Sequence, residues 1–167
     1  MADGLLTYAR KLAEEGPSAL LSLASPVLVW EGSPVRPGDD PFESTQGITF
    51  LTRPRAGEPL VFELKKNDAK LNAFGLGVTV GRADSNDVPL DDVSVSRFHA
   101  YFQKDPRDGW KLYDAESSNG TWVGALKLTG KGGEVVSDKS RVRFGDVELT
   151  FFEPKSFAAY VEQQMSR

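Results

Sequence analysis

Three groups of polar residues between positions 81 and 124 carry the side chains that could do chemistry. They are Gly81-Arg82, the run Ser94-Val95-Ser96-Arg97-Phe98-His99, and the run Ser117-Ser118-Asn119-Gly120-Thr121. An arginine offers a planar fork of N–H donors to phosphoryl oxygens, and a serine hydroxyl adds a short hydrogen bond to the same anion. An asparagine amide can donate to a peptide backbone and also accept from it. These residue types suit a phosphate, although a strand-end arginine or a Ser-Ser-Asn-Gly turn alone is usually a plain surface feature.

The composition argues against catalysis. The 167 residues contain no cysteine and one histidine, His99, which excludes thiol nucleophiles, thiolate metal sites and two-histidine metal sites. Ser96 and His99 could suggest a serine hydrolase, but the sequence offers neither a nucleophile elbow nor a clear third member of a triad. We therefore expect no enzymatic activity, no metal and no other cofactor.

Acidic residues crowd the connection that follows Arg82. They are Asp84, Asp87, Asp91 and Asp92. Their spacing does not fit an EF-hand loop, and no glutamate closes the group as such a loop requires. We expect these side chains to solvate the loop or to repel acidic side chains of a bound peptide, rather than to bind calcium.

Charge and hydropathy exclude two classes of partner. A net charge of -4 argues against a general nucleic-acid binder, whose domain is usually basic. The longest uncharged apolar stretch, Ser18 to Trp30, is shorter than the roughly 20 residues that a membrane-spanning helix needs, and it contains Pro26. The N-terminal residues do not resemble a signal peptide, because Asp3 stands where a basic start is expected. These features predict a cytoplasmic protein that binds neither nucleic acid nor membrane.

Short strands must position the three polar groups. Runs rich in β-branched and aromatic residues occur at Leu60–Leu64, Val78–Val80, Ala100–Phe102, Trp110–Tyr113 and Thr121–Val123. The clearest hairpin joins Arg141–Phe144 to Val147–Phe151 through a Gly145-Asp146 turn. This pattern predicts a mainly β fold, an antiparallel β-sandwich. The polar groups then lie on loops at strand ends, where a rigid sandwich displays a binding site.

Helical periodicity marks both ends of the chain. Apolar residues recur at helical spacing from Leu5 to Glu15, and Phe157, Tyr160 and Val161 form a second stripe after Pro154. Between them, either a second helix over residues 18–24 or a strand over residues 27–30 is expected. The predicted organisation is an N-terminal extension (1–31), a Pro- and Gly-rich linker (32–57), the sandwich (58–153) and a C-terminal helix (154–167). We expect the two stripes to pack on the sandwich or on each other, or else to dimerise the protein.

The three polar groups, in this order and at this spacing, resemble those of the forkhead-associated (FHA) domain, a phosphothreonine-recognition module. The resemblance covers roughly residues 58–153. It implies an FHA-like antiparallel β-sandwich that binds its peptide on loops at one end. The sequence departs from the family after Thr121, because Gly124-Ala125 stand where the family often has Asn-Gly, which affects the expected geometry of that turn.

The resemblance also implies a role for individual residues. The positions that contact the phosphate are matched by Arg82, Ser96 and Arg97. The positions that contact the peptide are matched by Ser118 and Asn119. Structural support of the site is implied for Gly81, His99 and Gly120.

The function implied is that of a phosphothreonine-peptide-binding adaptor in Ser/Thr kinase signalling. Its partner would be a threonine-phosphorylated protein, and phosphorylation of that partner would create the docking site. The alternative is a structural or assembly domain that keeps the FHA fold but binds its partner through another surface, such as the terminal helices.

Overall fold

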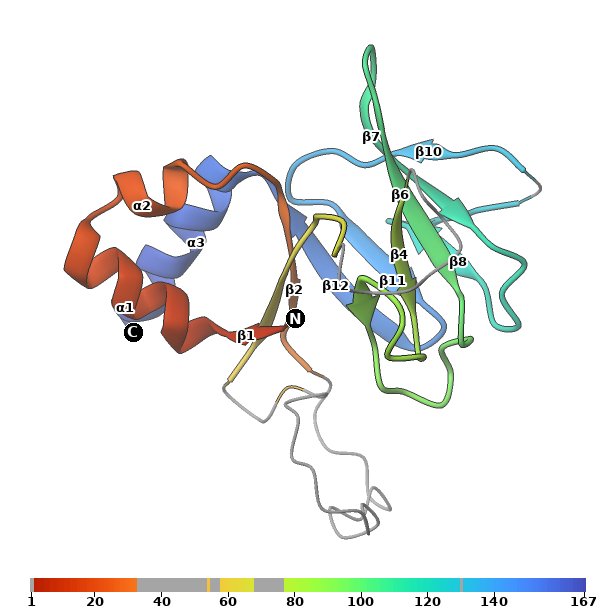
Figure 1. The fold of residues 1–167 in the computed structure, drawn as a ribbon, viewed down its shortest axis with the longest axis horizontal. Coiled ribbons are helices and arrows are strands. Elements are labelled where there is room, and N and C mark those ends of the chain that lie inside the picture. Colours follow the sequence, from red (N-terminus) through yellow and green to blue (C-terminus); the bar gives the residue numbers. More distant parts are fainter. Residues whose placement is uncertain (1, 33–53, 55–57, 68–76, 130) are drawn as a thin grey trace, which may run out of the picture.

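Two β-sheets lie face to face, and three helices pack on one part of the outer side of the larger sheet, over Val27, Val29, Val61 and Phe152 (Figure 1). The structure is a computed structural model that describes residues 2–32, 54, 58–67, 77–129 and 131–167. The predicted fold, a mainly β sandwich with short helices at both ends, is confirmed. The predicted linker, residues 32–57, lies outside the described residues except for Gly32 and Pro54.

The larger sheet has seven strands in the order β1-β3-β2-β12-β11-β8-β9, and neighbouring strands are antiparallel. Its strands are β1 (Asp3–Gly4), β2 (Val27–Trp30), β3 (Leu60–Glu63), β8 (Thr121–Val123), β9 (Leu126–Lys127), β11 (Arg141–Phe144) and β12 (Val147–Phe152). The predicted hairpin is present as β11 and β12, with Phe144 opposite Val147 on either side of the turn.

The smaller sheet has five strands in the order β10-β7-β6-β4-β5. Its strands are β4 (Val78–Gly81), β5 (Val88–Pro89), β6 (Ala100–Asp105), β7 (Gly109–Asp114) and β10 (Glu134–Val135). The short strand β5 runs parallel to β4, and the other pairs are antiparallel. Each polar group adjoins a strand end, because β4 ends at Gly81, β6 begins after His99 and β8 begins after Gly120.

The sandwich core lies between the two sheets. Phe102 of β6 and Phe144 of β11 meet there edge to face, with ring centroids 6.3 Å apart, and both are fully buried. Along β11 the side chains alternate, so that Val142 and Phe144 point into the core while Arg141 is exposed. This alternation is what a strand with one buried face requires.

Strand β2 separates two hydrophobic cores. Its four residues are all buried: Leu28 and Trp30 belong to the sandwich core, and Val27 and Val29 belong to a second core beneath the helices. A strand covered on both faces reads as an unbroken apolar run rather than as an alternating one. The sequence left a helix and a strand as alternatives in this region, and the structure contains both, since α2 (Ser18–Leu21) precedes β2.

The second core joins the two ends of the chain. Helices α1 (Leu5–Glu15) and α3 (Pro154–Met165) meet there, with Tyr8 edge to face on Phe157 at a centroid distance of 5.2 Å. Val61 and Phe152 form the floor of this core on the outer side of the sheet. The expectation that the terminal stripes pack against each other and against the sandwich is confirmed.

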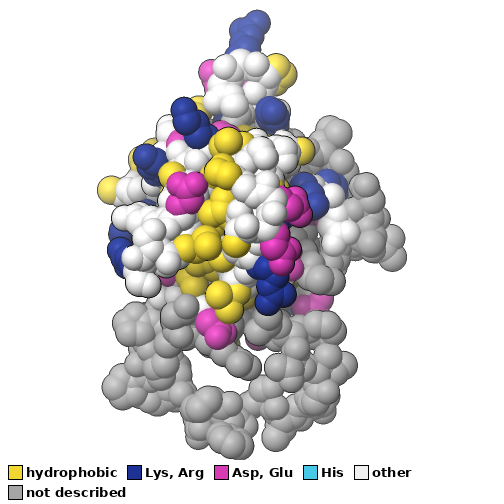
Figure 2. Space-filling model, turned by 90° about the vertical axis from the view of Figure 1, so that its left-hand side faces the viewer, with side chains coloured by type: hydrophobic (Ala, Val, Ile, Leu, Met, Phe, Trp, Pro, Cys, Tyr) yellow, Lys and Arg dark blue, Asp and Glu magenta, His cyan; other side chains and the backbone are white. Residues whose placement is uncertain are grey.

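The outer surface of the helical layer is partly apolar. Figure 2 views this side of the molecule and shows a strip of hydrophobic side chains bordered by charged ones. The exposed large hydrophobic residues of the three helices are Leu6, Leu21 and Met165. Within the described residues, none of the helices has the length and apolar character needed to cross a bilayer.

Candidate functional site

The three polar groups meet at one end of the sandwich. The backbone N–H of Arg82 donates to the carbonyl of Ser96 at 2.9 Å, which joins the first group to the second. The side chain of Asn119 donates through Nδ2 to the carbonyl of Ser94 at 2.8 Å, which joins the third group to the second. Residues separated along the chain thus form one hydrogen-bonded surface, which we call the loop site (residues 81–99 and 114–121).

Gly81 is required by the close approach of two backbone segments. A Cβ atom at this position would lie 2.3 Å from the carbonyl oxygen of Arg97, far inside contact distance. That carbonyl accepts hydrogen bonds from the N–H of Ala83 at 3.2 Å and from Nδ2 of Asn86 at 2.7 Å. The absence of a side chain at Gly81 therefore allows the Arg97 segment to dock against the end of β4.

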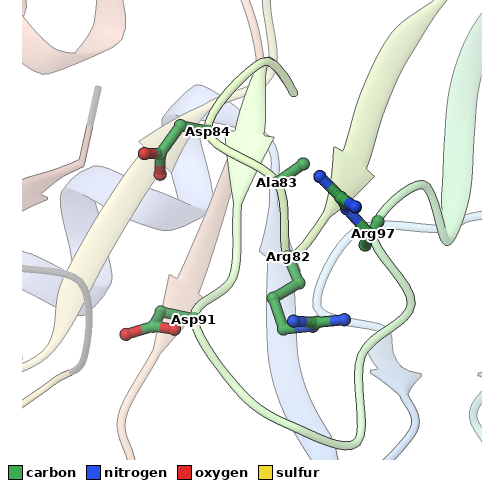
Figure 3. A pocket seen from close by; sticks show the side chains of 5 residues that line it. All are labelled: Arg82, Ala83, Asp84, Asp91 and Arg97. Carbon is green, nitrogen blue, oxygen red and sulfur yellow. The ribbon is translucent and has the colours of Figure 1, made fainter.

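Arg82 and Arg97 line the same open pocket, together with Ala83, Asp84 and Asp91 (Figure 3). The pocket has a volume of about 470 Å³. Both arginine side chains are exposed, and Nε of Arg82 donates to the carbonyl of Val95 at 3.1 Å, which fixes one side of the guanidinium. Two guanidinium groups on one concave surface form a suitable site for a multiply charged anion.

Ser96 directly precedes Arg97, and its carbonyl accepts the backbone N–H of Arg82. Its hydroxyl oxygen accepts a hydrogen bond from the backbone N–H of Ser118 at 3.0 Å. A hydroxyl has one donor in addition to its acceptor sites, so this contact leaves the hydroxyl hydrogen available to donate to an anion. The same contact ties Ser118, which is exposed, to the second polar group.

His99 connects the second and third groups from within the protein. Nδ1 accepts the backbone N–H of Ser96 at 2.9 Å, so the ring proton is on Nε2, which donates to the carbonyl of Gly120 at 2.8 Å. The side chain is fully buried, and burial lowers the pKa of the imidazole below its ordinary value. His99 therefore lies beneath the loop site and does not line the pocket.

Asp114 organises the third group, and we did not predict this residue from the sequence. Its Oδ1 accepts the hydroxyl groups of Ser117 and Thr121, each at 2.6 Å. The Ser117 hydroxyl in turn accepts the N–H of Gly120 at 3.0 Å, and Gly120 has a φ of +93°, which glycine adopts without strain. The Asp-x-x-Ser spacing, a common side-chain-to-backbone turn, was the local signal that could have identified Asp114.

The acidic connection differs from the prediction. Asp87 does not solvate the loop: it is only 4% exposed, and Lys66 Nζ contacts its carboxylate at 3.1 Å. Asp92 accepts the hydroxyl of Ser94 at 2.7 Å, and Ser94 is itself buried. The side chains of Asp84 and Asp91 line the pocket. Within the described part of the chain, no group of three potential metal-ligating side chains gathers.

The carboxylate of Asp87 is held by several donors. It accepts the backbone N–H groups of Thr79 at 2.9 Å and Asn67 at 2.8 Å. Burial alone would raise the pKa of this carboxyl, but the two backbone donors and the Lys66 ammonium outweigh it, so the pKa lies below the ordinary value. Asp87 thus joins the start of β4 to the segment that follows β3.

At Gly124-Ala125, where the sequence departs from the FHA pattern, the structure contains a regular turn. Gly124 has a φ of +57° between β8 and β9, and its N–H donates to the carbonyl of Arg141 at 2.8 Å. The two strands pair regularly on either side, with Val123 opposite Leu126. Gly124 therefore forms this turn without the asparagine that FHA domains often have at its position.

Residues 78–145 match the FHA domain family model. Two curated relatives are both named oxoglutarate dehydrogenase inhibitor. The one from Corynebacterium diphtheriae is 40% identical over 76 residues, which are 45% of this chain and 50% of the relative. The one from Corynebacterium jeikeium is 37% identical over 71 residues, 42% of this chain and 46% of the relative. The match thus spans about half the length of each relative.

A solved structure from an analysis of phosphothreonine-dependent FHA domain interactions is also similar. It is 19% identical, with a TM-score of 0.47, and the alignment covers 77% of this chain and 97% of that one. The family match contains all three polar groups, so the resemblance to FHA domains is confirmed.

Proposed function

We propose that this protein is a phosphothreonine-peptide-binding adaptor in Ser/Thr kinase signalling. The observation that carries the proposal is that Arg82 and Arg97, from two different segments, line one pocket within the region that matches the FHA family. A regulatory module of this kind acts by binding, and we propose no catalytic role for it. The partner would be a threonine-phosphorylated protein.

The phosphate would bind between the two arginines. The contact from Nε of Arg82 to the carbonyl of Val95 restrains the guanidinium, so that its terminal nitrogens would donate to phosphoryl oxygens. The hydroxyl of Ser96 would donate a further hydrogen bond, and Arg97 would add a second cation. Because the Arg82 guanidinium and the Ser96 hydroxyl are each held by a backbone contact, little side-chain entropy is lost at these two residues when the phosphate binds.

The peptide backbone would be held by the third group. Asn119 and Ser118 are exposed next to Ser96, and each is fixed by one hydrogen bond to the second group. An amide fixed in this way can donate to and accept from a peptide main chain. His99, Gly81 and Gly120 would keep the loop site in shape without touching the ligand.

Calorimetry on three versions of one peptide tests the proposal. The peptide is chosen from an oriented phosphopeptide library, and its phosphothreonine, phosphoserine and unmodified forms are compared. We expect binding to require phosphate. We also expect the phosphoserine form to bind more weakly, because one methyl group in a fitted pocket contributes about 1–3 kcal/mol.

Arg82→Ala should weaken the phosphothreonine peptide by about tenfold to a hundredfold, since a hydrogen bond to a charged group contributes about 1.5–3 kcal/mol. Arg82→Lys should restore little, because an ammonium keeps the charge but loses the planar fork. The matched control is Arg141→Ala, an exposed arginine of β11 that contacts Glu148. If the best phosphothreonine peptide binds no tighter than its unmodified form, the adaptor proposal fails and the assembly-domain alternative replaces it.

A further inference from the structure

Two cations and one aromatic ring lie side by side on the outer face of the larger sheet. Trp122 of β8 lies directly opposite Lys127 of β9 on one side and Arg143 of β11 on the other. Directly opposite residues of neighbouring strands share a face of the sheet, and Val142 and Phe144, on either side of Arg143, point into the core. The three side chains therefore form one outward-facing row, which we call the cationic row (Lys127, Trp122 and Arg143).

The indole ring of Trp122 holds both cations. Over this ring, Cζ of Arg143 lies 3.8 Å from the ring centroid and Nζ of Lys127 lies 5.3 Å from it. A cation is attracted to the face of an indole, so the ring restrains two side chains that are otherwise flexible. The two positive charges are thereby held close together, and a bound anion would relieve their mutual repulsion.

Within the described residues, no carboxylate neutralises the cationic row. Glu148 of β12 lies opposite Arg143, but its Oε1 contacts Arg141 instead, at 3.4 Å. The ion pairs of the described residues include neither Lys127 nor Arg143. Lys127 is exposed, and Trp122 and Arg143 are half-buried, so an anion can reach the row from solvent. On a protein with a net charge of -4, this local excess of positive charge favours an acidic ligand.

The helical layer lies over a different part of the sheet. The second core takes its sheet residues from β2, β3 and the end of β12, and its described residues include none from β8, β9 or β11. Figure 1 shows the helices at the left of the molecule and β8 at the right. The cationic row is thus separate from the second core and from the apolar strip on the helices.

The cationic row adjoins the loop site at Gly120. A Cβ atom at Gly120 would lie 2.8 Å from Cε of Lys127 and 2.9 Å from the ring of Trp122, so both side chains pack against the Gly120 backbone. The same glycine is held from within by Nε2 of His99, and Asn119 directly precedes it. A peptide main chain held by Asn119 would therefore have the cationic row as its neighbouring surface.

We infer that Lys127, Trp122 and Arg143 form a second contact surface, which binds an acidic segment of the phosphorylated partner. The occupant is a stretch of aspartate or glutamate residues near the phosphothreonine, whose carboxylates would accept hydrogen bonds from the ammonium and guanidinium groups. The inference rests on the proposed function, because it describes which threonine-phosphorylated proteins the domain would bind most tightly.

Calorimetry on the full chain tests this surface with peptides that share one phosphothreonine core. The core is the best sequence from the phosphopeptide library, and a short tract of glutamates or of glutamines is added to each end in turn. We expect a glutamate tract at one end to tighten binding by about threefold to tenfold relative to glutamine, since exposed ion pairs contribute modestly. The gain should shrink as salt is raised, because the cationic row is accessible to solvent.

The test variant combines Lys127→Gln with Arg143→Gln, which removes both charges and keeps polar side chains. In this variant the glutamate and glutamine tracts should bind about equally, while the core peptide still binds more tightly with phosphate than without. The matched control combines Arg10→Gln with Lys155→Gln, two exposed residues of α1 and α3, and changes the net charge by the same amount. The control should retain the gain from glutamate.

The indole N–H signal of Trp122 in NMR spectra provides a readout that does not depend on affinity. This signal, assigned with Trp122→Phe, should shift further with the glutamate-tract peptide than with the glutamine-tract peptide. The signal of Trp30, which is buried in the sandwich core, should not distinguish the two peptides. An equal response of Trp122 to both tracts would contradict a contact at the cationic row.

Failure of the acidic contact can be told apart from failure of the proposed function. If neither end distinguishes glutamate from glutamine, or if the gain survives in the Lys127 and Arg143 variant, the inference is overturned while phosphate-dependent binding stands. Equal loss of the gain in the control variant would also overturn it, because the gain would then reflect net charge. If the core peptide binds no more tightly with phosphate than without, the proposed function fails and the inference fails with it.

Discussion

The imidazole of His99 holds Ser96 by accepting its backbone N–H at Nδ1, over a distance of 2.9 Å. This contact requires the neutral ring, because a protonated Nδ1 would present a hydrogen to the Ser96 N–H. The other ring nitrogen is committed to the carbonyl of Gly120. One buried side chain thus fixes both the serine of the second group and the glycine of the third.

His99→Ala should lower the free energy of unfolding by about 2–4 kcal/mol, since it removes two buried hydrogen bonds and leaves a cavity. Because burial lowers the pKa of His99, the unfolded chain binds a proton more readily than the folded one below about pH 6.5. The wild type should therefore lose stability as the pH falls below that value, and the variant should lose less. Urea unfolding between pH 5 and 8 measures both effects.

Peptide affinity provides the control for His99. If the residue only braces the loop site, the affinity of wild type and variant should change in parallel between pH 6 and 8, because the phosphate itself titrates near pH 6. A profile that becomes flat in His99→Ala would contradict this and indicate direct contact with the phosphate.

Asp87→Asn should lower the free energy of unfolding by about 3–5 kcal/mol, because it leaves the Lys66 ammonium without its buried carboxylate. The lowered pKa of Asp87 means that its contribution is complete above about pH 4 and is lost as the pH falls further. The variant should accordingly show less loss of stability between pH 5 and 3. Asp108→Asn, in an exposed carboxylate, is the control, and an equal effect in both variants would refute the prediction.

Gly81→Ala should destabilise the protein by about 1–3 kcal/mol and weaken phosphopeptide binding. The added methyl group would meet the carbonyl of Arg97, a backbone atom that cannot move without shifting the loop site. Gly4→Ala is the matched control, because a Cβ at Gly4 would meet nothing within 4 Å. Chemical unfolding and calorimetry measure the two effects, and unchanged affinity in Gly81→Ala would show that the loop tolerates the displacement.

Phe157→Ala should cost about 3–5 kcal/mol of stability, since its ring is fully buried between Tyr8 and Phe152. Met165→Ala, at an exposed position of the same helix, should cost little. Phosphopeptide affinity should be unchanged in both, because the second core lies apart from the loop site. Sedimentation of the wild type tests the remaining possibility that the helical layer dimerises the protein.

Local sequence patterns predicted most of the helices and strands. The features that they did not predict depend on residues far apart in the sequence. The alternation along β11 and the stripe of α1 are properties of neighbouring residues, so they are visible in the sequence. The burial of Asp87 depends on Lys66 and Thr79, which reach it only through the packing of β3 and β4. An aspartate in a loop gives no local sign of such partners.

The candidate site likewise contains some features that are visible in the sequence and others that depend on the fold. The three polar groups were recognisable from their order and spacing, and Asp114 had a local signal that was not used. The gathering of Asp84 and Arg97 at one pocket was not recognisable, because it depends on the course of two loops relative to β4. The sequence predicted an acidic connection but could not distinguish its internal aspartates from its external ones.

The position of β2 limits how this domain can be excised. The family match begins at β4 and ends in the β11–β12 turn, so β3, β2 and β12 lie outside it although they form the middle of the larger sheet. A fragment cut at those limits would leave β11 with a bare edge of unsatisfied N–H and C=O groups, which templates aggregation. It would also uncover the inner side chains that Leu28 and Phe151 bury. Any graft of this domain onto another protein must therefore carry segments from both ends of the chain.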